Sequence, residues 1–162
     1  MRILIPVDGS AECEASLPVL ARWVGGLDAD VYLLQVIDGF ASTTGHVHHE
    51  PEWPGGIAAE VVAMMKKTRA YLDELVPRYE LPADRTRCIV GRSENPAEEI
   101  ITIAQNNDVD LIVISSHCRG WLGQLAQGSV CNEVIRSRVC PVLSVPLTNS
   151  HANRKGHGVL VG

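Results

Sequence analysis

Five short apolar runs recur along the chain, and longer segments with helical spacing separate them. The runs are rich in Ile, Val and Leu, and most are continuous rather than alternating. Continuous apolar runs are typical of strands buried on both faces of a parallel sheet. We predict strands over Arg2–Pro6, Asp30–Ile37, Arg85–Val90, Asp110–Ser115 and Pro141–Pro146.

Four intervening segments place apolar residues at the spacing of one helix face. In the first of these segments, Ala11–Gly25, Pro18 predicts either a kink or an irregular first turn. In the second segment, Ile57–Tyr79, we interpret Met64 and Met65 as residues that fill the core. Strictly alternating strands and helices predict an α/β layered domain with right-handed crossovers. The predicted helices cover Ala11–Gly25, Ile57–Tyr79, Pro96–Gln105 and Ser129–Arg138.

Composition narrows the class of protein further. A chain of 162 residues fits one domain, and a net charge of −5 argues against a nucleic-acid partner. No apolar run reaches the roughly 18 residues that a membrane span needs. The start, MRILIPVDGS, has the pattern of a strand rather than of a signal peptide, so we expect a cytoplasmic protein. An odd count of five cysteines without CxxC does not favour a disulfide framework.

Two segments fall outside the alternating pattern. Gly39–Gly56 contains "GHVHHEPEWPGG" and is predicted to be a long loop, hence a lid, a binding loop or a disordered segment. Residues 149–162 form a polar tail that we expect to be mobile. The loop holds His46, His48, His49, Glu50 and Glu52, but their spacing fixes no coordination geometry, so no resident metal is predicted.

Polar residues follow the first and fourth predicted strands. In open parallel sheets, ligands bind outside the carboxyl ends of the strands, where the winding reverses. Asp8 follows the first strand, and its carboxylate has two possible roles. It can accept a hydrogen bond from a ribose hydroxyl or an adenine amine, or it can close a turn before the first helix. His117 and Arg119 follow the fourth strand. A ligand contact and a structural or solvated role are both open for them.

A third feature is the start of the last predicted helix. Gly128, Ser129 and Val130 stand where free backbone N–H groups and the helix dipole attract anions, although Ser129 also suits a simple helix cap. The chain has no GxxxxGK[ST], GxGxxG, HExxH or GxSxG motif. We therefore assign no catalytic residue and favour a binding protein over an enzyme, with a slow ATP hydrolase as the alternative.

Three stretches together resemble the universal stress protein family, from Met1 to about Leu147. "ILIPVDGS" is similar to the family's first strand and aspartate turn, and "VGRSENPAEEIITIAQNNDVDLIVISSH" to its third helix and fourth strand. "GSVCNEVIRSRVCPVLSVP" is similar to its Gly-Ser-Val helix and last strand. The resemblance implies a single Rossmann-like three-layer α/β domain over residues 1–148. Its five-stranded parallel sheet has the order 3-2-1-4-5, with helices on both faces.

The resemblance also implies a nucleotide frame. Nucleotide-binding members carry Gly-x-x-Gly, nine residues, then Gly-Ser or Gly-Thr. Here the nine-residue gap and the closing Gly128-Ser129 are intact, whereas Ser115 and Cys118 replace the leading glycines. By resemblance, Asp8 and the backbones of Val7 and Val36 hold adenine, Ser115 and Cys118 lie against ribose and phosphates, and Ser129 and Val130 meet the phosphates. The candidate nucleotide-binding residues are Pro6, Val7, Asp8, Val36, Ser115, His117, Cys118, Arg119, Gly128, Ser129 and Val130.

The expected function is therefore a non-catalytic stress-response protein that binds ATP or AMP, with no metal beyond a nucleotide-bound Mg²⁺. The family commonly dimerises through its last strand, so we expect a homodimer through Pro141–Pro146. Two alternatives stay open. One is a dimeric stress protein with a degraded site, and the other is a redox or metal sensor built on Cys118 or on His46–His49.

Overall fold

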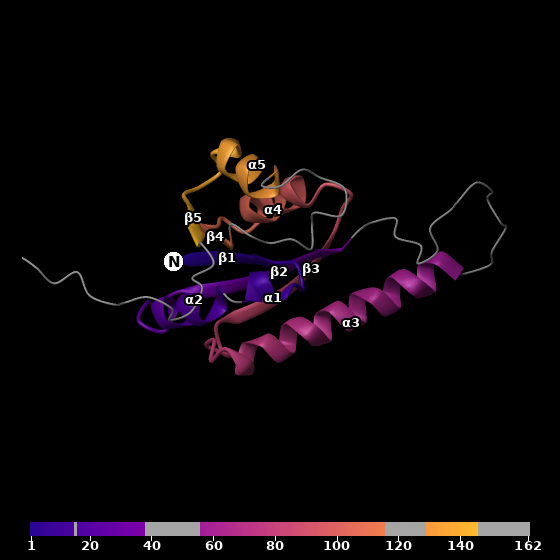
Figure 1. Cartoon of the computed structure of the whole chain (residues 1–162), viewed down its shortest axis with the longest axis horizontal. Coiled ribbons are helices and arrows are strands. Elements are labelled where there is room, and N and C mark those ends of the chain that lie inside the picture. Colours follow the sequence, from indigo (N-terminus) through magenta and orange to yellow (C-terminus); the bar gives the residue numbers. More distant parts are fainter. Residues whose placement is uncertain (15, 38–55, 116–128, 146–162) are drawn as a thin grey trace, which may run out of the picture.

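The protein is described by a computed structural model that covers residues 1–14, 16–37, 56–115 and 129–145. Its centre is a five-stranded sheet in which each strand runs parallel to its neighbours, in the order β3-β2-β1-β4-β5 (Figure 1). This confirms the predicted fold class and strand order. The strands are β1 (Arg2–Val7), β2 (Asp30–Ile37), β3 (Thr86–Arg92), β4 (Leu111–Ser115) and β5 (Val142–Val145).

Helices cover both faces of the sheet. One face packs against the first three helices and the other against the last two, which gives three layers (Figure 1). The helices are α1 (Ala11–Glu14), α2 (Leu17–Val24), α3 (Gly56–Arg78), α4 (Pro96–Asn106) and α5 (Ser129–Ser137).

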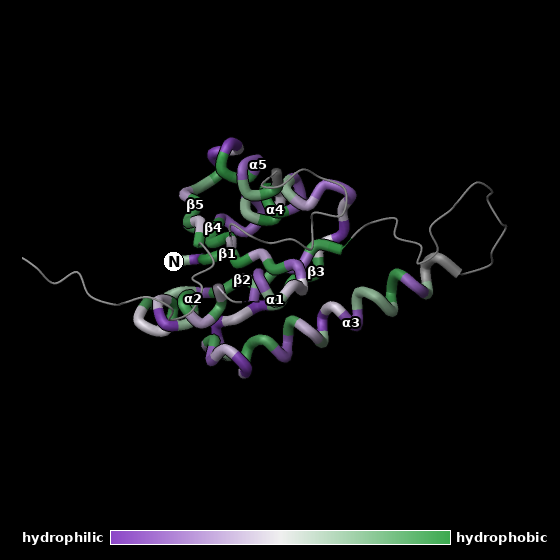
Figure 2. The backbone as a smooth tube through the Cα atoms, viewed as in Figure 1, coloured by the Kyte–Doolittle hydropathy of each residue, from purple (hydrophilic) through white to green (hydrophobic). Residues whose placement is uncertain are grey.

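The alternation of side chains along β1 supplies both halves of the core. Ile3, Ile5 and Val7 point toward α1, α2 and α3, whereas Leu4 joins the cluster beneath α4 and α5. All four are at most 2% exposed. Burial of β1 on both faces explains why its sequence is a continuous apolar run, and the hydropathy colouring shows this layer in green (Figure 2).

The predicted helix Ala11–Gly25 is wrong as a single element. The chain forms the short α1, turns, and begins again as α2 at Leu17. At the break the Ser16 hydroxyl donates to the Cys13 carbonyl at 2.8 Å, in place of a continued helical ladder. Pro18 then lies in the first turn of α2, where its missing N–H leaves no helical bond unmade.

The second correction concerns α3, whose first half extends past the body of the domain (Figure 1). Thr68, Leu72 and Leu75 are buried as their spacing predicts. Met65, however, is 37% exposed, so its assignment as core filler is wrong. Hydrophilic and hydrophobic stretches alternate along this helix in Figure 2, and only its second half lies against strands.

The remaining predicted boundaries match the observed ones or differ by at most two residues, as helix and strand ends usually do. The start of α4 is fixed by Asn95, whose side-chain oxygen accepts from the amides of Ala97 and Glu98. The predicted loop up to Gly55 and the tail 149–162 lie outside the described residues. Within the described ranges, no helix combines the length and the apolar character that crossing a membrane requires.

Candidate functional site

The topology reverses between β1 and β4. From β1 the chain goes to β2 on one side, whereas β4 pairs with β1 on the other, through Ile3 with Leu111 and Leu4 with Ile112. The carboxyl ends of these neighbouring parallel strands therefore reach the same edge of the sheet. This is the position at which open α/β sheets bind ligands, and we call it the crevice.

The turn after β1 is closed by its own side chains. Asp8 Oδ1 accepts hydrogen bonds from the backbone amide of Ser10 at 2.9 Å and from its hydroxyl at 2.6 Å. The Ser10 hydroxyl oxygen accepts in turn from the Cys13 amide at 3.2 Å, which caps α1. Gly9 has a φ of 79°, a left-handed conformation that glycine adopts without strain. Of the two roles left open for Asp8, the turn role is present in the structure.

Four of the candidate residues have side chains that belong to the core. Val7 and Val36 are 0% and 5% exposed, Val130 is 6% exposed, and Pro6 is buried within β1. At the strand ends, these residues can therefore contact a ligand through their backbone groups rather than through their side chains. Ser115, the last residue of β4, is also buried, and its strand position pairs with Val145.

Four of the candidate residues are not among those that the structure describes. His117, Cys118, Arg119 and Gly128 lie outside the described residues. Ser129 begins α5, so the predicted helix start is confirmed for the backbone. The topology thus brings Pro6, Val7, Asp8, Val36 and Ser115 to one edge of the sheet, with α5 beginning after β4.

Sequence reasoning missed one polar residue at this edge. Gln35 of β2 pairs with Val7, and its Oε1 is buried yet has no hydrogen-bond partner among the described residues. Its side-chain nitrogen lies 3.3 Å from the point where a Cβ on Gly9 would stand. The available signal was a single amide inside the otherwise apolar segment VYLLQVI.

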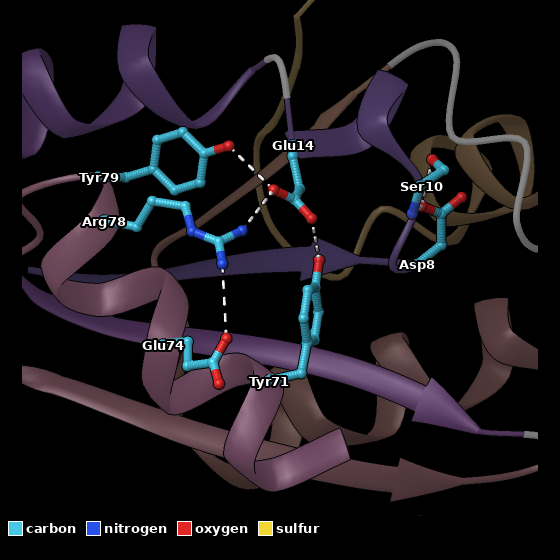
Figure 3. A network of polar contacts seen from close by, with 7 residues as sticks. All are labelled: Asp8, Ser10, Glu14, Tyr71, Glu74, Arg78 and Tyr79. Atoms are coloured by element: carbon cyan, nitrogen blue, oxygen red, sulfur yellow. Dashed lines mark hydrogen bonds and ion pairs between the residues drawn. The ribbon is translucent and has the colours of Figure 1, made fainter. Parts of the chain in front are cut away.

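A second polar group connects α1 with α3 and with Tyr79, the residue after α3 (Figure 3). Glu14 accepts hydrogen bonds from the hydroxyls of Tyr71 at 2.8 Å and Tyr79 at 2.9 Å, one on each carboxylate oxygen. Arg78 lies 3.4 Å from the Glu14 carboxylate and 3.4 Å from that of Glu74. The two tyrosines and the arginine thus fix the end of α1, which follows the Asp8 turn directly.

The electrostatics of this group keep the tyrosines neutral. Burial, then the hydrogen bond to Glu14 and its charge, raise the pKa of Tyr71 well above its ordinary value, and the charge of Asp8 adds to the effect. Burial and the same carboxylate raise the pKa of Tyr79, while Arg78 opposes the shift. Both hydroxyls are therefore protonated donors at neutral pH.

The cysteines divide into two kinds. Cys88, Cys131 and Cys140 are free thiols, and of these three only Cys88 is buried. Cys13 is disulfide-bonded, which the cysteine count did not predict. Burial, followed by the hydrogen bond to Asp73 and its charge, raises the pKa of the Cys88 thiol to about 11.

Two other features of the described chain concern possible ligand sites. An open groove of about 510 Å³ runs along α3 and the outer strand β3. Of its charged residues, Arg69 and Asp73 pair with each other at 3.0 Å, and Lys66 stands beside them. Among the residues with described positions, no cluster of three His, Cys, Asp or Glu side chains suits a metal ion. The sequence cluster His46–Glu52 lies outside these ranges.

Comparison with known proteins decides the family. The sequence model of the universal stress protein family matches residues 1–146. Universal stress protein MJ0577 from Methanocaldococcus jannaschii is 42% identical over 164 residues, which cover 92% of this chain and 96% of that protein. The chain belongs to the universal stress protein family.

Solved structures agree with this assignment. The structure of MJ0577 superposes on this universal stress protein with a TM-score of 0.64 at 25% identity, covering 92% of this chain and 97% of the other. The universal stress protein from Archaeoglobus fulgidus, in complex with dAMP, gives 0.59 at 20% identity, covering 89% and 96%. The family protein At3g01520 from Arabidopsis thaliana, with AMP bound, gives 0.57 at 12% identity, covering 95% and 97%. At such low identities the last two show the shared fold.

Proposed function

We propose that this universal stress protein binds an adenine nucleotide, ATP or AMP, in the crevice and acts by binding rather than by catalysis. The observation that carries the proposal is that proteins with this fold, over nearly their whole length, hold dAMP and AMP. A further universal stress protein of the same fold is in complex with cAMP. The proposed location is the cytoplasm.

The proposed contacts follow the family frame. Asp8 and the backbones of Pro6, Val7 and Val36 face the adenine. On the other side, the amides at the start of α5, from Ser129 and Val130, supply the donors and the positive dipole end that phosphates require. Ser115, His117, Cys118, Arg119 and Gly128 are proposed to border the ribose and phosphates. No protein-held metal is needed, because Mg²⁺ arrives with the nucleotide.

Titration calorimetry and thermal shift with ATP and with AMP test this function. We expect heat and a raised unfolding midpoint for at least one of the two nucleotides, since ligands that bind only the folded state stabilise it. If millimolar nucleotide produces no heat and no shift of the unfolding midpoint, the alternative of a stress protein with a degraded site is favoured. Steady-state phosphate release from ATP that disappears in Ser129→Ala would instead favour an enzyme.

Cys118 offers a sharper version of the same test, because it replaces a motif glycine. If that position takes a left-handed conformation, a residue with a Cβ costs about 1–2 kcal/mol. If binding requires that conformation, Cys118→Gly should bind nucleotide roughly five- to thirtyfold more tightly. Cys118→Ala is the matched control, because it removes the sulfur but keeps the Cβ, and it should gain much less.

The proposed assembly is a homodimer through the last strand, Pro141–Pro146. β5 stands at the end of the sheet order and pairs with β4 alone within the described residues. An exposed strand edge favours pairing with a second copy. Light scattering should give twice the monomer mass, and a monomer at all concentrations would contradict the proposal.

A second candidate function is a thiol–disulfide sensor, favoured by the disulfide state of Cys13. Of the described cysteines, Cys88, Cys131 and Cys140 are free thiols, and Cys118 is the one cysteine of the sequence outside the described residues. We propose that Cys13 and Cys118 form this bond reversibly. Their two thiols would pass two electrons and two protons to a low-molecular-weight disulfide, which leaves as two thiols.

Peptide mapping without reductant tests this pairing. Cys13→Ser and Cys118→Ser should each abolish the cross-linked peptide and any response of the unfolding midpoint to reductant. Cys140→Ser is the control and should keep both. A cross-link that involves neither residue would overturn the proposal.

A further inference from the structure

The carboxamide of Gln35 has a hydrogen-bonding capacity that the described protein does not use. Its Oε1 is buried, and it accepts no hydrogen bond from any residue that the structure describes. A buried acceptor without a donor destabilises a fold, so such atoms are rare and call for a bound group or a functional role. Gln35 therefore offers a buried acceptor that a bound group could satisfy.

The strand register places this carboxamide at the crevice. Gln35 pairs with Val7, the last residue of β1, and lies in phase with Val31 and Leu33 on the face that α1, α2 and α3 cover. Its side-chain nitrogen reaches to 3.3 Å from the position of a Cβ on Gly9. The amide thus borders the turn that contains Asp8, at the edge where the nucleotide is proposed to bind.

The neighbouring polar side chains already have partners. Asp8 Oδ1 is held by Ser10, and both oxygens of Glu14 accept from tyrosine hydroxyls. Gln35 has only intermediate exposure, and its terminal torsion is soft. Rotation about that torsion exchanges oxygen and nitrogen, so either atom can face the crevice.

A carboxamide presents one acceptor beside one donor. Adenine presents the complementary pair, an exocyclic amine beside a ring nitrogen, and glutamine binds adenine through two hydrogen bonds of this kind. We propose that Gln35 recognises the adenine base of the nucleotide, its oxygen accepting from the exocyclic amine. This inference rests on the proposed function of the crevice and adds to it the residue that selects the base.

A cycle of two ligands and two proteins tests the contact. The ligands are AMP and purine riboside monophosphate, which is AMP without the exocyclic amine. The proteins are wild type and Gln35→Met, which keeps the length of the side chain without its hydrogen-bonding groups. Wild type should bind AMP about tenfold more tightly than the analogue, whereas Gln35→Met should bind the two alike.

The matched control is Gln105→Met on α4. Asn107, two residues after Gln105, accepts through its carbonyl from Arg2 at the amino end of β1. Gln105 therefore lies near the edge of the sheet opposite to the crevice. This variant should keep the wild-type preference for AMP. Circular dichroism and the unfolding midpoint check that Gln35→Met folds, and Gln35→Leu serves in its place if it does not.

The possible failures are distinct. A preference for AMP that is the same in wild type and in Gln35→Met would overturn the role of Gln35 and leave nucleotide binding intact. Equal binding of AMP and the analogue by wild type would overturn it as well. No binding of either ATP or AMP by wild type at millimolar concentration would overturn the proposed function and this inference together.

Discussion

The Tyr71 hydroxyl donates a 2.8 Å hydrogen bond to Glu14 Oε1 and so joins the second half of α3 to the short helix α1 (Figure 3). Tyr79, which directly follows the last residue of α3, holds the other oxygen of the same carboxylate at 2.9 Å. Because α1 follows the Asp8 turn directly, α3 fixes the position of that turn without contributing a residue to it. The network therefore links the stability of α3 packing to the shape of the crevice.

Glu14→Ala should destabilise the protein. The substitution leaves two partly buried tyrosine hydroxyls and Arg78 without their shared acceptor, and the Glu14 side chain is only 15% exposed. We expect the free energy of unfolding to fall by about 2 kcal/mol in urea denaturation. Glu12→Ala is the control on the same helix, with an expected change within about 0.5 kcal/mol. Equal losses in the two variants would show that the network contributes nothing of its own.

Tyr71 should make stability depend on alkaline pH. Its pKa is raised in the folded state, so the unfolded chain releases the hydroxyl proton first, near an ordinary value of roughly 10. The contribution of neutral Tyr71 is fully present below that pH and is lost as the pH rises above it. Wild type should therefore lose stability faster than Tyr71→Phe above about pH 10 in denaturant titrations. Parallel curves for the two proteins would contradict this.

Much of the fold could be predicted because buried strands and helix faces require apolar residues, which are visible in the sequence. A strand such as β1, covered by helices on both faces, has to be apolar at every position, and that run is visible without a structure. The Asp8 turn was predictable for a different reason. Asp-Gly-Ser forms a turn through hydrogen bonds between its own side chains and backbone. Both features depend on residues close together in the chain.

Features that depend on distant residues could not be predicted. Glu14 meets Tyr71 across 57 positions, and Gln35 borders Gly9 only because β1 and β2 pair in one particular register. The break between α1 and α2 was underestimated because Pro18 is compatible with both a kinked helix and a new first turn. Met65 was misplaced because helical spacing says which face is apolar, but not how far the sheet extends beneath it.

Cys88 should react slowly with alkylating reagents in the native protein. Burial and the Asp73 carboxylate raise the pKa of its thiol to about 11, so little reactive thiolate forms near neutral pH. Cys131, a free thiol of intermediate exposure, provides the internal comparison. Mass spectrometry after a short iodoacetamide pulse should find Cys131 modified well before Cys88. In denaturant the two rates should converge, and a fast native reaction at Cys88 would show that it is accessible.

Gly9→Ala tests the geometry of the crevice turn. The new methyl group would stand on a backbone with a φ of 79° and only 3.3 Å from the Gln35 side-chain nitrogen. The left-handed conformation alone costs a non-glycine residue about 1–2 kcal/mol, and the amide has to move as well. We expect a loss of about 2 kcal/mol in the free energy of unfolding, together with weaker nucleotide binding.

The matched control is Gly26→Ala, where an added Cβ meets only the Trp23 carbonyl at an ordinary 3.7 Å. At that position alanine should be neutral or slightly stabilising, because it reduces the freedom of the unfolded chain. Gly9→Ala combined with Gln35→Ala separates the two causes at the turn. If the contact with the amide matters, shortening Gln35 recovers part of the loss, whereas a purely conformational cost leaves the two changes additive.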